Sequence, residues 1–237
     1  SFGSPPVAQA CARFAQASRA LACQPASGKL HKSGCNGMKK ILKGLSRFQA
    51  EVFPEERELF ERLASGQNPE ALVLTCSDSR IVPELITQTR PGDLFICRNA
   101  GNIAPAYGEA TGGVSATIEY AVLALGVRDI IVCGHSDCGA MKALLAPESL
   151  GKMPTVSTWL KHAEPARLVV EEHYGALGAK ERLAVLIEQN VGAQLANLHT
   201  HPSVASKLHK GELALHGWVY DIQSGEVEAY DRAARRF

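Results

Sequence analysis

The sequence predicts an α/β protein with a mainly parallel central β-sheet flanked by helices and preceded by an N-terminal helical arm. Short, continuous apolar runs alternate with stretches of helical periodicity, and strands buried on both faces of a parallel sheet have this continuous apolar character. Three such runs occupy residues 71–76, 93–98 and 129–133. A chain of 237 residues with 46% hydrophobic content can bury a core of this kind. We therefore expect one compact domain over residues 38–237.

Helical spacing of apolar residues predicts the helices that flank this sheet. The N-terminal arm is predicted by one apolar helix face, made by Ile41, Leu42, Leu45, Phe48 and Val52. Further helices are expected over residues 55–64, 116–125 and 180–198, and two closing strands over residues 213–220 and 226–230.

Residues 1–37 differ in composition from the rest of the chain. They are rich in Ala, Ser, Gly and Pro, and they contain basic but no acidic residues. A short helix over residues 8–22 in such a segment is typical of an organelle transit peptide, although non-native upstream sequence before Met38 fits equally well. We expect residues 1–37 to be an extension outside the domain. The expected location is cytoplasmic, or an organelle if this extension is a genuine transit segment.

Charge and cysteine usage exclude several classes of protein. Lysine and arginine total 25 against 24 acidic residues, so nothing indicates the strongly basic face that nucleic-acid binding requires. No apolar run approaches the roughly 20 residues that cross a bilayer, so no membrane partner is expected. The seven scattered cysteines favour reduced thiols. Cys97 and Cys133 lie within apolar runs and are expected to be core residues.

Metal-binding side chains lie at or just after the carboxyl ends of two of the three apolar runs. Cys76 ends the first run, and His135 and Cys138 come directly after the third. Ligands of open α/β sheets collect at the carboxyl ends of strands, so these side chains are expected to meet. Two thiolates and one imidazole form the set with which a catalytic zinc keeps a fourth position open. A chance His-x-x-Cys pair and a structural zinc site are the alternatives, although structural sites usually have four ligands.

Asp78 and Arg80 add a feature that a structural zinc site does not require. A carboxylate two residues after Cys76 can bind the metal itself or accept a hydrogen bond from metal-bound water. The guanidinium of Arg80 can hold this carboxylate through a bidentate ion pair. The alternative is an ordinary ion pair within a loop.

The pattern Cys-x-Asp-x-Arg followed by His-x-x-Cys resembles the β-class carbonic anhydrases, in particular their plant-like branch. The similarity covers about residues 38–231 and leaves residues 1–37 outside. Matching segments include residues 98–102, 112–120 and 216–221, and residues 153–157 and 194–198 are most similar to bacterial enzymes associated with cyanate metabolism.

This resemblance implies a lyase that interconverts carbon dioxide and bicarbonate with one zinc ion per chain. It implies that Cys76, His135 and Cys138 bind the zinc and that Asp78 and Arg80 form the catalytic dyad. Zinc lowers the pKa of bound water toward about 7, so a zinc-bound hydroxide is the expected nucleophile. Near pH 8 we expect Asp78 to pair with Arg80 rather than to bind the metal.

The resemblance also implies a substrate pocket and an oligomer. It assigns substrate binding to Gln67, Phe95, Tyr120 and Gly139, with Gln67 orienting substrate oxygens and the two aromatic rings walling an apolar slot. Ala100 stands where plant enzymes commonly have a branched aliphatic residue, which leaves the width of the slot open. Without the resemblance, these side chains would be interpreted as surface or core. The expected assembly is a dimer or a tetramer built from dimers.

Two other functions fit parts of the pattern. A binding or assembly protein with a structural zinc site would share the Cys and His ligands. Hydrolysis of carbon disulfide or carbonyl sulfide is a possible activity of the same fold. The dyad and the open ligand count favour carbonic anhydrase over both.

Overall fold

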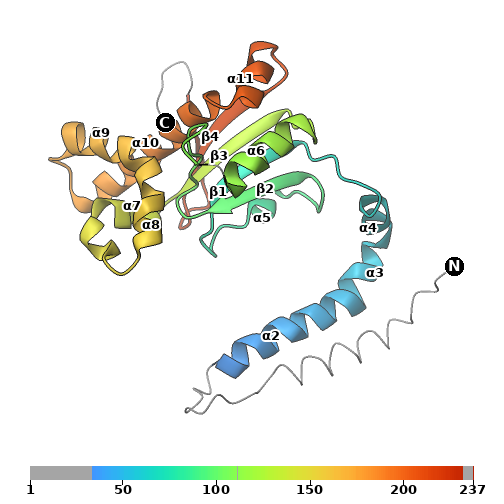
Figure 1. Cartoon of the computed structure of the whole chain (residues 1–237). Helices are drawn as coiled ribbons and strands as arrows, with labels where there is room; N and C mark the ends of the chain where they lie inside the picture. Colours follow the sequence, from blue (N-terminus) through green and yellow to red (C-terminus); the bar gives the residue numbers. More distant parts are fainter. Residues whose placement is uncertain (1–33, 111, 232–236) are drawn as a thin grey trace. The chain divides into compact units, whose positions relative to one another are not determined.

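The computed structural model describes residues 34–110, 112–231 and 237, and the chain divides into two compact units between Gly66 and Gln67 (Figure 1). The helix predicted over residues 8–22 lies outside the described residues, and the extent of the domain stays a prediction. The first unit is helical. It consists of α2 (Gly34–Arg47), the π-helix η1 (Phe48–Val52), α3 (Phe53–Glu55) and α4 (Arg57–Leu63).

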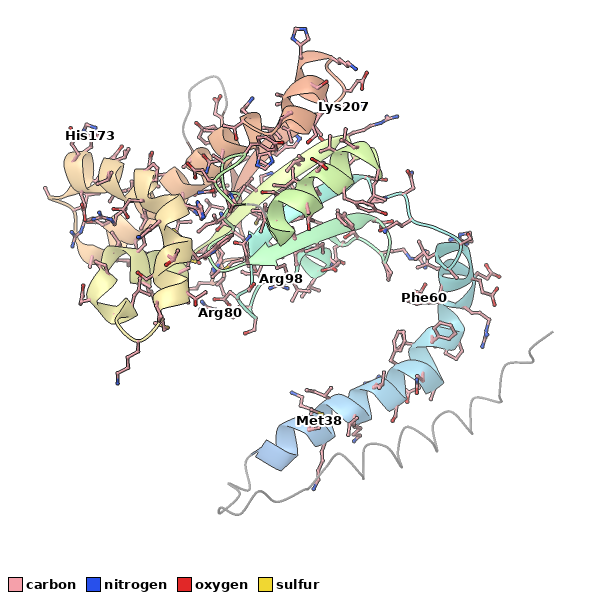
Figure 2. All side chains as sticks on the ribbon, viewed as in Figure 1. Met38, Phe60, Arg80, Arg98, His173 and Lys207 are labelled. Carbon is pink, nitrogen blue, oxygen red and sulfur yellow. The ribbon has the colours of Figure 1, made fainter. Side chains whose placement is uncertain are left out.

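Aromatic contacts stabilise this first unit. The rings of Phe48, Phe53 and Phe60 contact one another, with centroids 5.4–6.1 Å apart. The predicted N-terminal helix is confirmed, but its apolar face is not covered within the unit, since Ile41 is 64% exposed and Val52 is 42% exposed. Figure 2 labels Met38 and Phe60 on these helices.

The second unit contains a five-stranded sheet with the order β2-β1-β3-β4-β5. Its first four strands are parallel, and β5 pairs antiparallel with β4. The predicted α/β class is therefore confirmed. The third apolar run extends two residues beyond its predicted end, because pairing with β4 continues as far as His135 and Tyr220. The strands are β1 (Ala71–Cys76), β2 (Leu94–Asn99), β3 (Asp129–His135), β4 (Ala214–Tyr220) and β5 (Val227–Ala229).

Helices connect these strands and cover the sheet. The predicted helices over residues 116–125 and 180–198 correspond to α6 and α10, whereas several short helices between β3 and α10 were not predicted. Within the described residues, no helix is both long and apolar enough to cross a membrane. The helices are α5 (Pro83–Thr87), α6 (Gly113–Leu123), α7 (Gly139–Leu145), α8 (Pro154–Leu160), α9 (Glu164–Tyr174), α10 (Ala179–His199) and α11 (Pro202–His209), with 3₁₀ turns η2 (Pro147–Leu150) and η3 (Lys161–Ala163).

Two apolar clusters position the carboxyl edge of the sheet. The larger cluster packs one face of the sheet against α6, α10 and α11, and it includes the fully buried Leu72 and Ile130. The second cluster joins α7, α8, α9 and α10 to the end of β1, and it includes Cys76 and Cys138. As predicted, Cys97 and Cys133 are buried. Two of the expected metal ligands are thus held by core packing, which limits their motion.

Candidate metal centre

The strand topology brings the three predicted ligands together. Cys76 is the last residue of β1 and His135 is the last residue of β3, and these neighbouring parallel strands end at the same edge. Cys138 follows one tight turn later, at the start of α7. Asp137 adopts a left-handed conformation in that turn, with φ of 61°. The ligand atoms of Cys76, His135 and Cys138 all lie within 4.8 Å of one another, and the three residues are buried.

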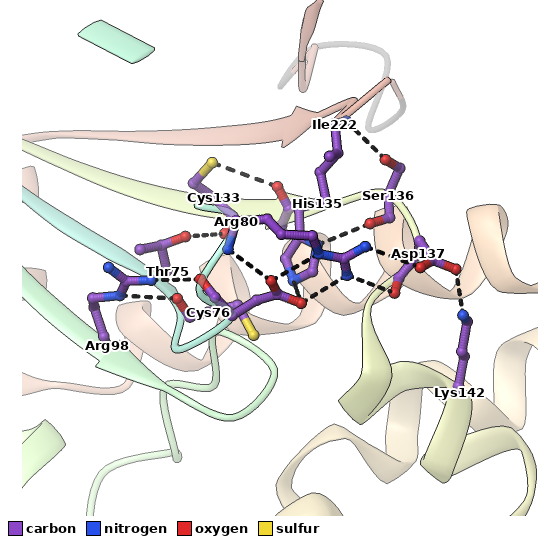
Figure 3. Close-up of polar contacts among 12 residues, drawn as sticks. Thr75, Cys76, Arg80, Arg98, Cys133, His135, Ser136, Asp137, Lys142 and Ile222 are labelled. Carbon is purple, nitrogen blue, oxygen red and sulfur yellow. Dashed lines mark hydrogen bonds and ion pairs between the residues drawn. The ribbon is translucent and has the colours of Figure 1, made fainter. Parts of the chain in front are cut away.

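Hydrogen bonds fix the orientation of the His135 ring. Its Nδ1 lies 2.9 Å from the carbonyl oxygen of Ser136 (Figure 3). This leaves Nε2 for the cluster with Cys76 and Cys138. That Nε2 is buried and has no hydrogen-bond partner. Ser136 is itself held in place, because its backbone N–H donates to the carbonyl of Tyr220 and its Oγ accepts from the N–H of Ile222. An orphaned imidazole nitrogen held in this way is typical of a metal ligand.

The two cysteine thiols differ in acidity. The adjacent Cys138 thiol lowers the pKa of Cys76 well below its ordinary value, and the nearby His135 ring and the backbone of Gly101 and Asp78 add to this effect against the opposing effect of burial. The neighbouring Cys76 and burial raise the pKa of Cys138. The site therefore stabilises a thiolate, the form in which cysteine binds metals.

The protonation of the third ligand depends on the same neighbours. Burial alone would lower the pKa of His135, but the adjacent Cys76 and the carbonyl of Ser136 raise it. The raised pKa favours the protonated imidazole. A metal ion that binds His135 would displace this proton, since metal ions bind the neutral imidazole.

The donor set fits a zinc ion. Ligand atoms around one tetrahedral zinc lie roughly 3.5–4 Å apart, which is compatible with the observed cluster. Sulfur and imidazole donors are also those that zinc prefers. Among the described residues, no second group of three potential ligands comes together. Burial raises the pKa values of the other two buried cysteines, Cys97 and Cys133, which favours their thiol form.

Asp78 and Arg80 form a bidentate pair beside the cluster. Arg80 donates from Nε to Oδ1 of Asp78 at 2.9 Å and from Nη2 to Oδ2 at 2.8 Å. These bonds and the backbone N–H of Arg80 hold the pKa of Asp78 well below its usual range. Oδ2 of Asp78 lies 4.0 Å from Nε2 of His135. The structure therefore has the expected arrangement, with the carboxylate on Arg80 and directly beside the cluster.

Two further charged residues support this pair, and their roles were not predicted. Asp137 accepts a hydrogen bond from Nη1 of Arg80 at 3.1 Å and forms an ion pair with Lys142. Arg98 donates to the backbone carbonyls of Cys76 and Asp78 at 3.1 and 2.7 Å. Arg98 lies in a segment that matched the family, and Asp137 lies between two ligands. Their positions in the sequence place both residues near the predicted site, but they do not indicate which groups these side chains contact.

The predicted substrate residues are divided between two places. Gly139 is exposed directly beside Cys138, and a Cβ added there would meet no atom within 4 Å. Phe95 and Tyr120 contact each other, with ring centroids 6.0 Å apart. Their location is different, because Phe95 lies four strand positions before the residue that pairs with Cys76. This offset corresponds to about 13 Å along the sheet.

Gln67 lies at the amino end of the parallel strands, as the aromatic pair does. It is exposed and precedes β1 by four residues, at the end of that strand opposite to Cys76. The structure of a single chain therefore brings Gly139 to the cluster, whereas Gln67, Phe95 and Tyr120 lie away from it.

Comparison with known proteins gives a consistent result. The profile of the carbonic anhydrase family matches residues 71–227. A carbonic anhydrase from Pseudomonas aeruginosa is 56% identical over 200 residues, which cover 84% of this chain and 90% of that protein.

Solved structures agree with the sequence relatives. The β-carbonic anhydrase CcaA superimposes with a TM-score of 0.83 and 49% identity, covering 85% of this chain and 98% of the other. A structure from a study of two tetrameric β-carbonic anhydrases of Sordaria macrospora has a TM-score of 0.74 and 32% identity, covering 82% of this chain and 96% of the other.

Proposed function

The chain belongs to the β-class carbonic anhydrases, and we propose that it hydrates carbon dioxide reversibly to bicarbonate and a proton with zinc held by Cys76, His135 and Cys138. The observation that supports this proposal is a buried cluster of two sulfur donors and one nitrogen donor with the Asp78–Arg80 pair at its edge. When bound, zinc supplies a Lewis acid that makes a water molecule acidic enough to act as nucleophile near neutral pH.

Asp78 orients the reacting water in this proposal. Its carboxylate stays ionised beside Arg80 and lies close to the ligand cluster, so it can accept a hydrogen bond from that water. Arg80 binds both oxygens of Asp78, which would keep the carboxylate from becoming a ligand of a bound zinc. Arg98 holds the backbone of the loop that contains Asp78. Fixed orientation of this kind lowers the barrier because little reorganisation is needed during the reaction.

We further propose that Gln67, Phe95 and Tyr120 act in the site of a second copy of the chain. Within one chain they lie away from the cluster, as the strand register shows. Tyr120 is nevertheless 52% exposed and the nearby Leu123 is 62% exposed, so α6 presents apolar side chains that a second copy could cover. The tetrameric state of the Sordaria enzymes supports self-association. The assembly would be a dimer or a tetramer of dimers, with carbon dioxide and bicarbonate as the small-molecule partners.

A reducing compartment, in particular the cytoplasm, is proposed as the location. Cys76 and Cys138 lie close together and are free thiols, and oxidation of either would remove a metal ligand. Fractionation of source cells with an antibody to the protein would test this location. Recovery of the protein in an oxidising compartment would contradict it.

Stopped-flow measurement of carbon dioxide hydration by the purified, zinc-loaded protein tests the main proposal. We expect rates far above those of buffer alone, together with zinc content near one ion per chain. Zinc binding without hydration would instead indicate a structural zinc site. Release of sulfide from carbon disulfide or carbonyl sulfide, with no carbon dioxide hydration, would indicate the alternative hydrolase activity.

A further inference from the structure

The peptide between Ala100 and Gly101 lies in the loop after β2, beside the Cys76 ligand. Asn99, the last residue of β2, pairs with Cys76 in the sheet, and its backbone carbonyl accepts from the N–H of Ser77 at 2.9 Å. Gly101 is buried and adopts φ of +84°, a conformation that glycine accommodates without strain. The position of this loop therefore affects how the ligands beside it are held.

Gly101 also packs against the segment that holds the second cysteine ligand. A Cβ at this position would lie 2.9 Å from Cε of Met141 and 3.3 Å from Cβ of Ala140. Ala140 and Met141 belong to the first turn of α7, which begins directly after Cys138, and Met141 packs in the same apolar cluster as Cys76 and Cys138. A displacement of this peptide would therefore disturb the packing that holds both cysteines.

Two side chains distant in sequence hold this peptide. The indole Nε1 of Trp159, on α8, donates to the carbonyl of Ala100 at 2.9 Å. This carbonyl belongs to the same peptide unit as the N–H of Gly101. On the other side, Nδ2 of Asn190, on α10, donates to the carbonyl of Gly101 at 3.0 Å. The peptide is therefore fixed on both carbonyls that flank the Gly101 Cα.

The orientation of Asn190 is fixed by a buried network. Its Oδ1 accepts a hydrogen bond from Nε2 of Gln194 at 2.9 Å, and Oε1 of Gln194 accepts from the N–H of Ala104. Asn190 and Gln194 are both fully buried. A buried amide left without partners is costly, so a network in which these groups are paired specifies one geometry.

We propose that Trp159 and Asn190 are positioning residues of the metal site, which act through the packing of Gly101 against the start of α7. The proposal rests on the assignment of Cys76, His135 and Cys138 as zinc ligands. Neither side chain is itself one of these ligands. Their effect is to keep the loop that contains Gly101 packed against the first turn of α7, next to Cys138.

Metal affinity and spectroscopy of variants that remove one hydrogen-bond donor each test this role. Trp159→Phe removes the indole N–H and keeps an aromatic ring, and Asn190→Leu removes the amide at similar size. We expect chelator competition to show a loss of zinc affinity of roughly 10- to 100-fold for Asn190→Leu and a smaller loss for Trp159→Phe. In the cobalt-substituted protein, the thiolate-to-metal charge-transfer band should shift, because displaced cysteine sulfurs change the coordination geometry.

The chain offers matched controls. Trp218→Phe makes the same change in the second tryptophan, which packs in the cluster on the other face of the sheet. Leu198→Ala removes buried volume from the same helix as Asn190. Both controls should lower thermal stability while zinc affinity stays within about twofold of the wild-type value.

An unchanged affinity and cobalt spectrum in folded Trp159→Phe protein would overturn the proposal, and this variant decides the matter if Asn190→Leu does not fold. Equal losses of zinc affinity in the controls would also overturn it, because the effect would then follow general stability. The outcome is separable from the proposed activity. A wild-type protein that binds zinc but does not hydrate carbon dioxide would contradict the activity and leave this test intact.

Discussion

The metal centre and the predicted substrate wall lie at opposite ends of the same parallel strands. Cys76 is the last residue of β1, whereas Phe95 is the second residue of the neighbouring strand β2. The three ligands are buried and converge within 4.8 Å, but Tyr120 is half exposed and lies against Phe95 rather than against the ligands. The three proposed ligands converge within one chain, whereas the proposed substrate residues Phe95 and Tyr120 do not reach them.

This difference separates two ways of building a site. Ligands at the ends of adjacent parallel strands must meet, because the sheet places those ends at a common edge. Side chains at the other end of the strands cannot reach that edge within one chain, so their participation requires a second copy. A substitution at a ligand should therefore inactivate the site of the chain that carries it. A substitution at Gln67, Phe95 or Tyr120 should instead weaken the site of the partner chain.

Replacement of a ligand is expected to have the largest effect. Cys76→Ala or His135→Ala removes one of three donors, so zinc content should fall from near one ion per chain to near zero and hydration activity should be lost. Elemental analysis of purified protein measures this directly. Cys97→Ala is the matched control, since Cys97 is buried but lies outside the cluster. Full zinc retention in the His135 variant, or iron in place of zinc, would contradict the ligand assignment.

Replacement of the carboxylate at the cluster edge should abolish much of the turnover but not the metal. We expect Asp78→Asn to keep zinc and to lower kcat by about 10²-fold or more, the scale of losing one positioned charged group. Asp137→Asn should cost much less, because the bidentate Asp78–Arg80 bonds remain in place. Stopped-flow assays between pH 6.5 and 9 make the comparison. Near-normal rates for Asp78→Asn across that range would remove Asp78 from the mechanism.

Mixed oligomers test whether the pocket crosses between chains. The double variant Gln67→Ala, Tyr120→Ala should lose activity about 10-fold or more through poorer substrate positioning. Coexpressed with Cys76→Ala, it should recover about a quarter of wild-type activity, since half of randomly paired dimers are mixed and each has one intact site. No recovery in verified mixed dimers, or a fully active monomer in sedimentation experiments, would show that the pocket belongs to one chain.

The smallest expected effect concerns Glu188 on α10. Burial, and then the charge of Glu228, raise the pKa of Glu188. The folded state therefore binds more protons than the unfolded state above the unfolded pKa of about 4.3, and stability decreases as pH rises through this window. Glu188→Gln should raise the melting temperature by roughly 1–2 °C at pH 7, with no gain near pH 4.

Glu172→Gln, on the exposed face of α9, serves as the control for this change. A gain for Glu188→Gln that is equally large at pH 4 and pH 7 would show that ionisation of Glu188 is not its cause. Differential scanning calorimetry of each variant against the wild-type protein in the same metal state gives the difference at each pH.

Much of the fold was predictable because its signals are local. The bounds of β1 match the first apolar run, and β2 is displaced by one residue, since strands buried on both faces leave continuous apolar segments. The short helices α7, α8 and α9 were not predicted. α7 and α8 span only seven residues each, and the packing of all three helices in the second apolar cluster supports them more than local propensity does.

The sequence by itself determined the α/β class, the candidate ligands Cys76, His135 and Cys138, and the adjacent pair Asp78 and Arg80. The ligands and the pair are recognised by residue type and by their short spacing along the chain. Their position at the end of a strand places these side chains at the carboxyl edge of the sheet. Resemblance to a family added Gln67, Phe95 and Tyr120, but not the fact that they lie away from the ligands within one chain.

Only the tertiary structure decided which groups support the ligands. Asn190 contacts Gly101 across 89 positions of sequence, and Trp159 contacts Ala100 across 59. A single sequence contains no local signal for such pairs, because an asparagine in a helix looks the same whether it faces water or a buried carbonyl. The contact exists because helix packing against the sheet brings α8 and α10 to the loop after β2, and that packing depends on the whole core at once.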